Sequence, residues 1–115
     1  MRAGNLDKRV AILRSTKAHD GLQRVETWAV AGSRWASRKA LPGGERGEAE
    51  GRRSFARYSL WLRLDSLTGT ITSADAIGML GERFELIQPP VAMDRSREQG
   101  IELLVEGTGE PWSAP

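Results

Sequence analysis

The sequence predicts an all-β protein, a small antiparallel β-barrel of about six short strands with a long loop between strands. Three observations predict this fold. Apolar and polar residues alternate with a period of two in several short segments. Turn-forming residues, among 13 glycines and five prolines, separate these segments at intervals of roughly 8–12 positions. No segment keeps a helical period beyond roughly ten residues.

The first strand is predicted over residues 8–14, with Val10 and Ile12 on one face. A turn follows at residues 19–21, because Asp-Gly supplies the positive φ that a tight hairpin requires. Two further strands are predicted over residues 22–30 and 33–40, separated by Ala31 and Gly32.

The clearest alternation covers residues 55–65 and predicts a half-buried strand. One face carries Ala56, Tyr58, Leu60, Leu62 and Leu64, and the other carries Arg57, Ser59, Arg63 and Asp65. After a turn at Thr68 and Gly69, residues 75–80 are predicted to pair with residues 82–88 across Gly81. Two prolines end that strand, and residues 101–106 form the last one.

The length of 115 residues predicts one domain, over residues 1–106, followed by a flexible tail over residues 107–115. Without cysteine, the chain has no disulfide framework and no thiolate metal site. Apolar runs are too short for a membrane span or a signal peptide, so we expect synthesis and folding in a cytoplasm. Trp112 is unusual in such a tail. Either the tail is disordered, or Trp112 docks on a neighbouring subunit.

Charge is distributed unevenly along the chain. Residues 1–57 carry 13 Lys/Arg and 6 Asp/Glu, a net +7, whereas residues 58–115 carry 4 and 9, a net −5. A chain polarised in this way can present a basic face to one partner and an acidic face to another, including a second copy of itself. The alternative is that the two halves mix in the barrel and the asymmetry disappears.

The sequence contains no pattern typical of an enzyme. The one histidine, His19, lies in a predicted turn, where a solvated side chain is expected. Glu45, Glu48 and Glu50 lie among glycines and arginines and are expected to be solvated, whereas general acid–base catalysis needs a shifted pKa. We therefore predict no catalytic residue, no metal site and no cofactor.

A basic frame surrounds the glycine-rich segment. Arg34, Arg38 and Lys39 precede it, and Arg52, Arg53 and Arg57 follow it. These charges could contact phosphates without sequence specificity. Several aromatic residues nearby could stack on bases in a barrel groove, although core or interface positions are the simpler interpretation: Trp28, Trp35, Phe55, Tyr58 and Trp61.

Both ends of the chain, and several segments between them, carry short motifs. The chain opens with the pattern Gly-x-Leu-x-x-Arg-Val, carried by Gly4, Leu6, Arg9 and Val10. The later motifs are Val25-Glu26-Thr27-Trp28, Trp35-Ala36, residues 41–45, Asp75-x-Ile, Gly81-x-Arg-Phe-Glu-Leu-Ile, Asp94-Arg-x-Arg and Glu102-Leu-Leu. In order and spacing, over roughly residues 1–106, these motifs resemble the head–tail joining family of tailed bacteriophages. Members of the family often carry a basic residue where this chain has Ala76.

The resemblance implies a β-barrel that assembles into a ring of six or twelve copies in the virion neck, as the head-closure or stopper protein. Its expected partners are a portal-bound adaptor on the head side, a tail terminator or tail-side protein, other copies of itself and packaged double-stranded DNA, with no membrane. By position, residues 38–54 correspond to the loop that blocks the channel in stopper relatives. The residues expected to face DNA are Arg38, Lys39, Arg46, Arg52 and Arg53.

Two alternatives remain. The chain could be a tail-side joining or completion protein of the same neck. From another class, it could be a β-barrel that binds single-stranded nucleic acid. Affinity of the free monomer for oligonucleotides distinguishes the second alternative, because a connector should bind DNA weakly until it is assembled.

Overall fold

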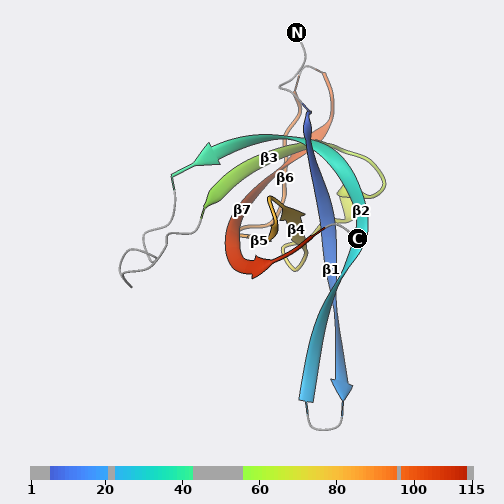
Figure 1. Ribbon diagram of the computed structural model, residues 1–115. Helices are drawn as coiled ribbons and strands as arrows, with labels where there is room; N and C mark the ends of the chain where they lie inside the picture. Colours follow the sequence, from blue (N-terminus) through green and yellow to red (C-terminus); the bar gives the residue numbers. More distant parts are fainter. Residues whose placement is uncertain (1–5, 21–22, 43–55, 96, 114–115) are drawn as a thin grey trace.

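The computed structural model describes residues 6–20, 23–42, 56–95 and 97–113, and its main feature is an antiparallel β-barrel (Figure 1). The elements are β1 (Lys8–Asp20), β2 (Gln23–Leu41), β3 (Arg57–Arg63), a short 3-10 helix η1 (Thr68–Thr70), β4 (Ala76–Met79), β5 (Glu82–Leu86), β6 (Val91–Ala92) and β7 (Gly100–Pro111). This architecture confirms the predicted fold class.

The barrel closes through six of the seven strands. Their order is β3-β2-β1-β4-β5-β7, and β7 pairs back with β3, while β6 adds only to the edge of β7. Every pairing is antiparallel. Closure leaves no free edge around the barrel itself, which removes a route to aggregation.

The barrel interior is filled by the inward-facing residues of all six strands. The core includes Val10 and Ile12 on β1, Leu60 and Leu62 on β3, and Phe84 on β5, all almost completely buried. Tyr58 meets Phe84 edge-to-face, with ring centroids 5.7 Å apart. The predicted core face of β3 is confirmed for Tyr58, Leu60 and Leu62. The predicted half-burial is wrong in part, because Ser59 and Trp61 on the other face are also buried and Leu64 is exposed.

The structure joins two strands that the sequence analysis separates. Residues 23–41 form one continuous strand, because pairing with β1 continues on both sides of Ala31. The register shifts by one residue between Ile12↔Gly32 and Leu13↔Val30. Ala31 is the extra residue of a β-bulge, which bends a strand without ending it. The predicted break at Ala31 and Gly32 is therefore wrong, although the local irregularity is real.

Strands β1 and β2 extend beyond the barrel as a long two-stranded hairpin (Figure 1). Only residues 11–13 of β1 pair with β4, whereas pairing with β2 continues to Asp20↔Gln23. The hairpin predicted near Asp20 is thus present, although His19 and Asp20, which are assigned to the turn, are the last residues of β1. At the other end of the chain, β7 continues through residues 107–111, which the sequence analysis assigns to the tail.

The hairpin between β4 and β5 also agrees with the prediction. Met79 pairs with Glu82, so Leu80 and Gly81 form the connection, with φ angles of 54° and 75°. Positive φ at both positions is the geometry of a type I′ turn, whose twist matches that of the flanking strands.

Candidate functional site

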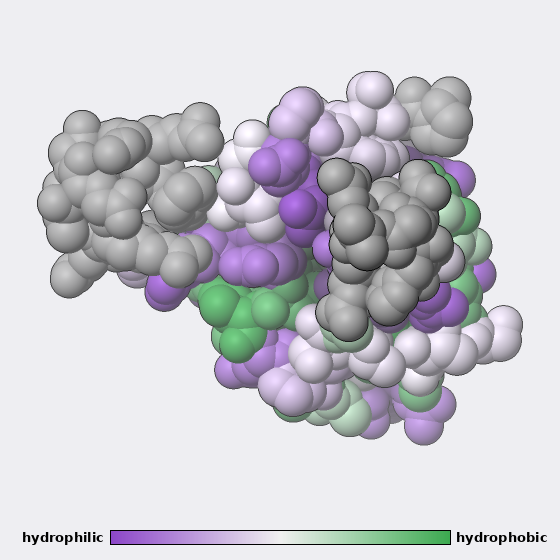
Figure 2. Space-filling model, turned by 90° about the horizontal axis from the view of Figure 1, so that it is seen from below, coloured by the Kyte–Doolittle hydropathy of each residue, from purple (hydrophilic) through white to green (hydrophobic). Residues whose placement is uncertain are grey.

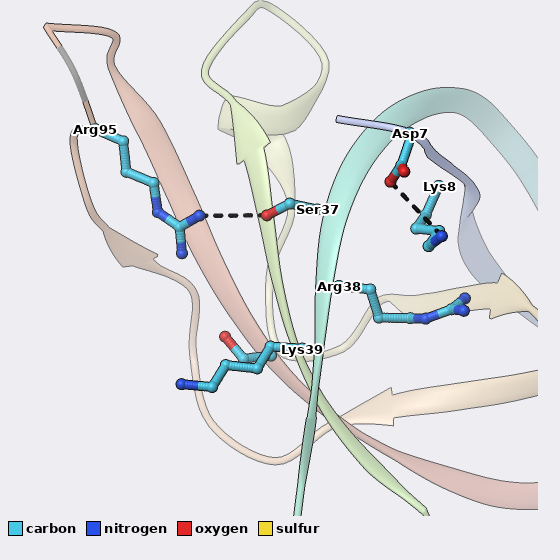
Figure 3. A pocket seen from close by; sticks show the side chains of 7 residues that line it. Asp7, Lys8, Ser37, Arg38, Lys39 and Arg95 are labelled. Carbon is cyan, nitrogen blue, oxygen red and sulfur yellow. Dashed lines mark hydrogen bonds and ion pairs between the residues drawn. The ribbon is translucent and has the colours of Figure 1, made fainter. Parts of the chain in front are cut away.

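A basic crevice of about 350 Å³ lies at the end of β2 (Figure 3). β1 begins at Lys8, which pairs with Ala36, so the following residues of β2 pair with β3 alone among the described strands. Side chains from four separate parts of the chain reach this region. The lining residues are Asp7, Lys8, Ser37, Arg38, Lys39, Ser59 and Arg95.

Arg38 and Lys39 lie on opposite faces of β2 because successive strand residues point to opposite sides. Figure 3 shows their side chains leaving the strand in opposite directions. Arg38 places its guanidinium carbon 5.4 Å from the centre of the Tyr58 ring, at the mouth of the barrel. Lys39 is exposed on the outer face. Both residues line the crevice, from its two sides.

Arg95 reaches the crevice from a hairpin that folds against the outside of the barrel. Backbone hydrogen bonds from Met93 N to Gly100 O (2.8 Å) and from Arg95 N to Glu98 O (2.9 Å) form this hairpin. The indole N–H of Trp61 donates to the carbonyl oxygen of Met93 (2.6 Å) and so fastens the hairpin to β3.

Trp61 also provides the surface on which the Arg95 side chain lies. The guanidinium carbon of Arg95 is 5.2 Å from the centre of the indole ring, and its Nη1 donates to Ser37 Oγ (3.3 Å). These contacts hold a cation beside β2. Trp61 is fully buried although it lies on the outer face of β3, which the period-two pattern does not predict.

The charges of the crevice are predominantly positive. Lys8 pairs with Asp7 (3.7 Å), whereas Arg38, Lys39 and Arg95 form no ion pair with a carboxylate that the structure describes. The Ser59 hydroxyl donates to Glu102 Oε2 (2.9 Å), which uses its one proton. Cations grouped around a hollow are suited to phosphate or carboxylate groups.

The remaining predicted site residues lie elsewhere. Arg46, Arg52 and Arg53, and most of the predicted loop over residues 38–54, fall outside the described residues. The first four positions of that loop, residues 38–41, belong to β2. Trp112 packs on its own barrel, against Ala11, Leu13 and Ala76, and its ring remains partly exposed.

Two cations of the crevice were missed by the sequence analysis. Lys8 is the first residue of β1, and Arg95 belongs to the Asp94-Arg-x-Arg segment that only the resemblance singles out. Neither residue is near Lys39 in the sequence, and only strand pairing and the Trp61 contact bring them together. Within the described part of the chain, no helix is long and apolar enough to span a bilayer. No group of three or more His, Cys, Asp or Glu suited to a metal ion occurs there either.

The fold and the crevice together define a small barrel with a positively charged crevice at one end of β2. Two solved structures share this fold across nearly the whole chain. One is a chain in the virion of a native gene transfer agent particle, with a TM-score of 0.64, 15% identity, and coverage of 94% of this chain and 96% of that chain. The other is protein SF1141 from Shigella flexneri 2a, with a TM-score of 0.66, 21% identity, and coverage of 96% and 99%.

The chain belongs to the family of phage head completion proteins, whose family model matches residues 1–107. It is therefore a structural component of the virion neck, where head and tail meet. No curated protein matches it at a significant level.

Proposed function

We propose that the protein is the head-closure component of the neck, a ring-forming barrel that joins the DNA-filled head to the tail and retains the packaged DNA. Its neighbours are an adaptor on the portal side, a tail-side protein and further copies of the same chain. The chain acts by binding and not by catalysis. The observation that carries the proposal is the group of cations without carboxylate partners around the end of β2, among the described residues.

The crevice contacts DNA through its phosphates in this proposal. Arg38, Lys39 and Arg95 carry three positive charges on side chains that line the crevice. Phosphate contacts of this kind position DNA without reading its sequence, and their strength falls steeply with salt. Non-specific contact suits packaged DNA, because any part of the genome can stop at the neck.

A charge-neutralising series in purified particles tests this function. Lys39→Gln and Arg38→Gln each remove one crevice cation, and Arg97→Gln removes one exposed cation that does not line the crevice, as the control. We expect the chain to remain in the neck in all three variants, while DNase-sensitive DNA increases in the two crevice variants. Full heads in a Lys39→Gln/Arg38→Gln double variant would overturn the DNA contact. Absence of the wild-type chain from the neck would overturn the whole function.

The predicted channel loop has its own test. If residues 38–54 block the channel, deletion of residues 43–51 leaves the neck assembled and allows DNA to leave. Particles that stay full after the deletion would exclude a plugging role for this segment while leaving the joining role in place.

The tail-side position predicts different neighbours. Chemical cross-linking and mass spectrometry of purified particles would identify them directly. Cross-links to the portal adaptor support head closure, whereas cross-links confined to tail proteins would move the chain to the tail side of the neck.

A further inference from the structure

The charge asymmetry of the sequence persists in the folded barrel. β1 and β2, which come from the basic half of the chain, are neighbours in the sheet. β5 and β7, which come from the acidic half, are also neighbours. In the closed order β3-β2-β1-β4-β5-β7, one strand separates the two pairs on each side, β4 on one and β3 on the other. The two pairs therefore lie on opposite walls of the barrel.

The outer surface of the β1–β2 wall carries an exposed aromatic and cationic group, here called the Trp35 face and consisting of Arg9, Val30 and Trp35. Trp35 pairs with Arg9 across the strands, and Val30 pairs with Leu13. Trp35 is 51% exposed and Val30 is 39% exposed. The guanidinium carbon of Arg9 lies 5.1 Å from the centre of the Trp35 ring and has no carboxylate partner among the described residues.

The opposite wall carries aliphatic and acidic residues, here called the Ile87 face and consisting of Glu85, Ile87, Val91, Glu102 and Leu104. Leu86 is in the core, so the adjacent residues Glu85 and Ile87 point outward. Strand pairing makes the group continuous, because Ile87 N donates to Leu104 O (2.9 Å) and Val91 pairs with Glu102. Ile87 is 43% exposed and Val91 is 40% exposed.

Single exposed aliphatic residues are ordinary on protein surfaces, whereas a contiguous group of them indicates an interaction site. Figure 2, which looks at the molecule from the side of the projecting hairpin, shows hydrophobic side chains in more than one area of that face, among hydrophilic side chains. An apolar centre with a charged rim is typical of protein interfaces.

We infer that the Trp35 face of one copy packs against the Ile87 face of the next copy, and that this contact closes the ring. The inference rests on the proposed function for the existence of a ring. Trp35 places its ring on the aliphatic side chains of Ile87, Val91 and Leu104, and Arg9 pairs with Glu85. Because the two faces differ and lie on opposite walls, the contact is heterologous and repeats around a ring until it closes.

The charges of the two faces disfavour a contact between two Trp35 faces or between two Ile87 faces. Two Trp35 faces would bring Arg9 against Arg9, and two Ile87 faces would bring Glu85 and Glu102 against their copies. Like charges placed together in this way disfavour a symmetric dimer. Trp28 and Trp112 pack against Leu13, the partner of Val30, so the partly exposed ring of Trp112 borders the Trp35 face and joins the contact between copies.

Single cysteines can test this contact directly, because the natural chain has none. Ser33 pairs with Ala11 on the outer side of the β1–β2 wall, and Gln88 follows Ile87, so neither substitution removes a residue of either face. Particles would be assembled with Ser33→Cys, with Gln88→Cys, or with a mixture of both chains, and treated with a short bismaleimide. Ser66→Cys, at an exposed turn position, replaces Gln88→Cys in the control mixture.

The inference predicts cross-linked dimers in the Ser33→Cys/Gln88→Cys mixture and none in either single variant or in the control. Dimers from Ser33→Cys alone would indicate a symmetric contact and overturn the inference. So would a chain that is present in the neck without any cross-link between Ser33→Cys and Gln88→Cys. Absence of the chain from the neck overturns the proposed function instead, so the two failures are distinguishable.

A charge exchange provides a second readout, which also serves if the cysteine variants do not assemble. Arg9→Glu alone or Glu85→Arg alone places like charges together, and incorporation into the neck should fall roughly tenfold or more. A chain with both substitutions restores an opposite pair at every contact, so incorporation should recover. Equal incorporation of all four chains, or loss without recovery in the double variant, would overturn the Arg9–Glu85 contact.

Discussion

The indole ring of Trp112 lies across Gly78 on the outside of the barrel. A Cβ atom added to Gly78 would come within 2.6 Å of the ring, so only glycine permits this approach. The backbone N–H of Trp112 also donates to Gly81 O (3.0 Å), which fixes the end of β7 beside the β4–β5 hairpin. The last strand is thus held by a side chain that the sequence analysis placed in a flexible tail.

Gly78→Ala should displace Trp112 and destabilise the fold by about 1–3 kcal/mol, as overpacking does. The free energy of unfolding in denaturant measures the effect. The matched control is Gly69→Ala, because the nearest atom to its added Cβ is Leu64 Cδ1 at 3.5 Å, an ordinary contact. In a Trp112→Ala background the Gly78→Ala cost should largely disappear. An unchanged cost in that background would show that the ring does not restrict residue 78.

Leu80→Asn should stabilise the protein by about 0.5–1 kcal/mol, because leucine is disfavoured at the positive φ that a type I′ turn requires. Leu80 is 56% exposed, so little apolar burial is lost. Thermal unfolding measures the gain. Leu64→Asn is the control, since Leu64 is 44% exposed and is not among the described non-glycine residues with positive φ. A loss of stability in Leu80→Asn would mean that the leucine makes contacts that outweigh its backbone cost.

Asp65 should make stability depend on pH in the acid range. Partial burial raises the pKa of its carboxyl, but hydrogen bonds from the backbone of Thr68, from Arg34 and from the backbone of Leu67 outweigh burial and lower the pKa below 3.8. A lowered pKa in the folded state gives stability that is fully present above pH 3.8 and is lost as the pH falls through the folded-state pKa.

Asp65→Asn should therefore lower stability above about pH 4 and lose that disadvantage at lower pH. The free energy of unfolding from pH 2 to pH 6 measures this difference. Asp94→Asn, at an exposed position without an ion pair to a described residue, is the matched control. A difference between wild type and Asp65→Asn that stays constant with pH would contradict the account of Asp65.

Trp61→Phe should loosen the hairpin that carries Arg95. The phenyl ring keeps most of the packing but cannot donate to Met93 O, and the lost hydrogen bond costs about 1 kcal/mol. Hydrogen exchange at the amides of Met93 and Arg95 should accelerate, because these amides close the hairpin. Trp35→Phe is the control, at a tryptophan that is 51% exposed, and protection of the same amides should not change there. Equal exchange in both variants would contradict the fastening role of Trp61.

Much of the barrel follows from period-two patterning. The strand around residues 57–63, the turn at Gly81 and the existence of a hairpin near Asp20 follow from alternation and turn chemistry, which are local properties of the sequence. The length of the hairpin does not, because β1 continues to Asp20 through the predicted turn. The bulge at Ala31 was interpreted as a break, since a glycine after a small residue is also typical of a strand end. Only the continued pairing with β1 distinguishes the two.

The site was less predictable, because it depends on contacts between distant residues. Arg38 and Lys39 were identified from charge, and both line the crevice. Their opposite directions follow from strand geometry, once residues 38–41 are assigned to β2 and not to a loop. Arg95 had no signal of its own, because the Trp61 contact that holds it arises only when the 93–100 hairpin folds over β3.

The central claim is that this chain forms the closing ring of the neck. Cryo-electron microscopy of purified particles from its source tests the claim most directly. The account predicts a ring of these barrels between head and tail, with the crevice that Arg38 and Lys39 line open toward the channel and Trp35 against Ile87 of the adjacent copy. A neck in which this chain is absent, or present only as isolated copies that do not contact one another, would contradict it.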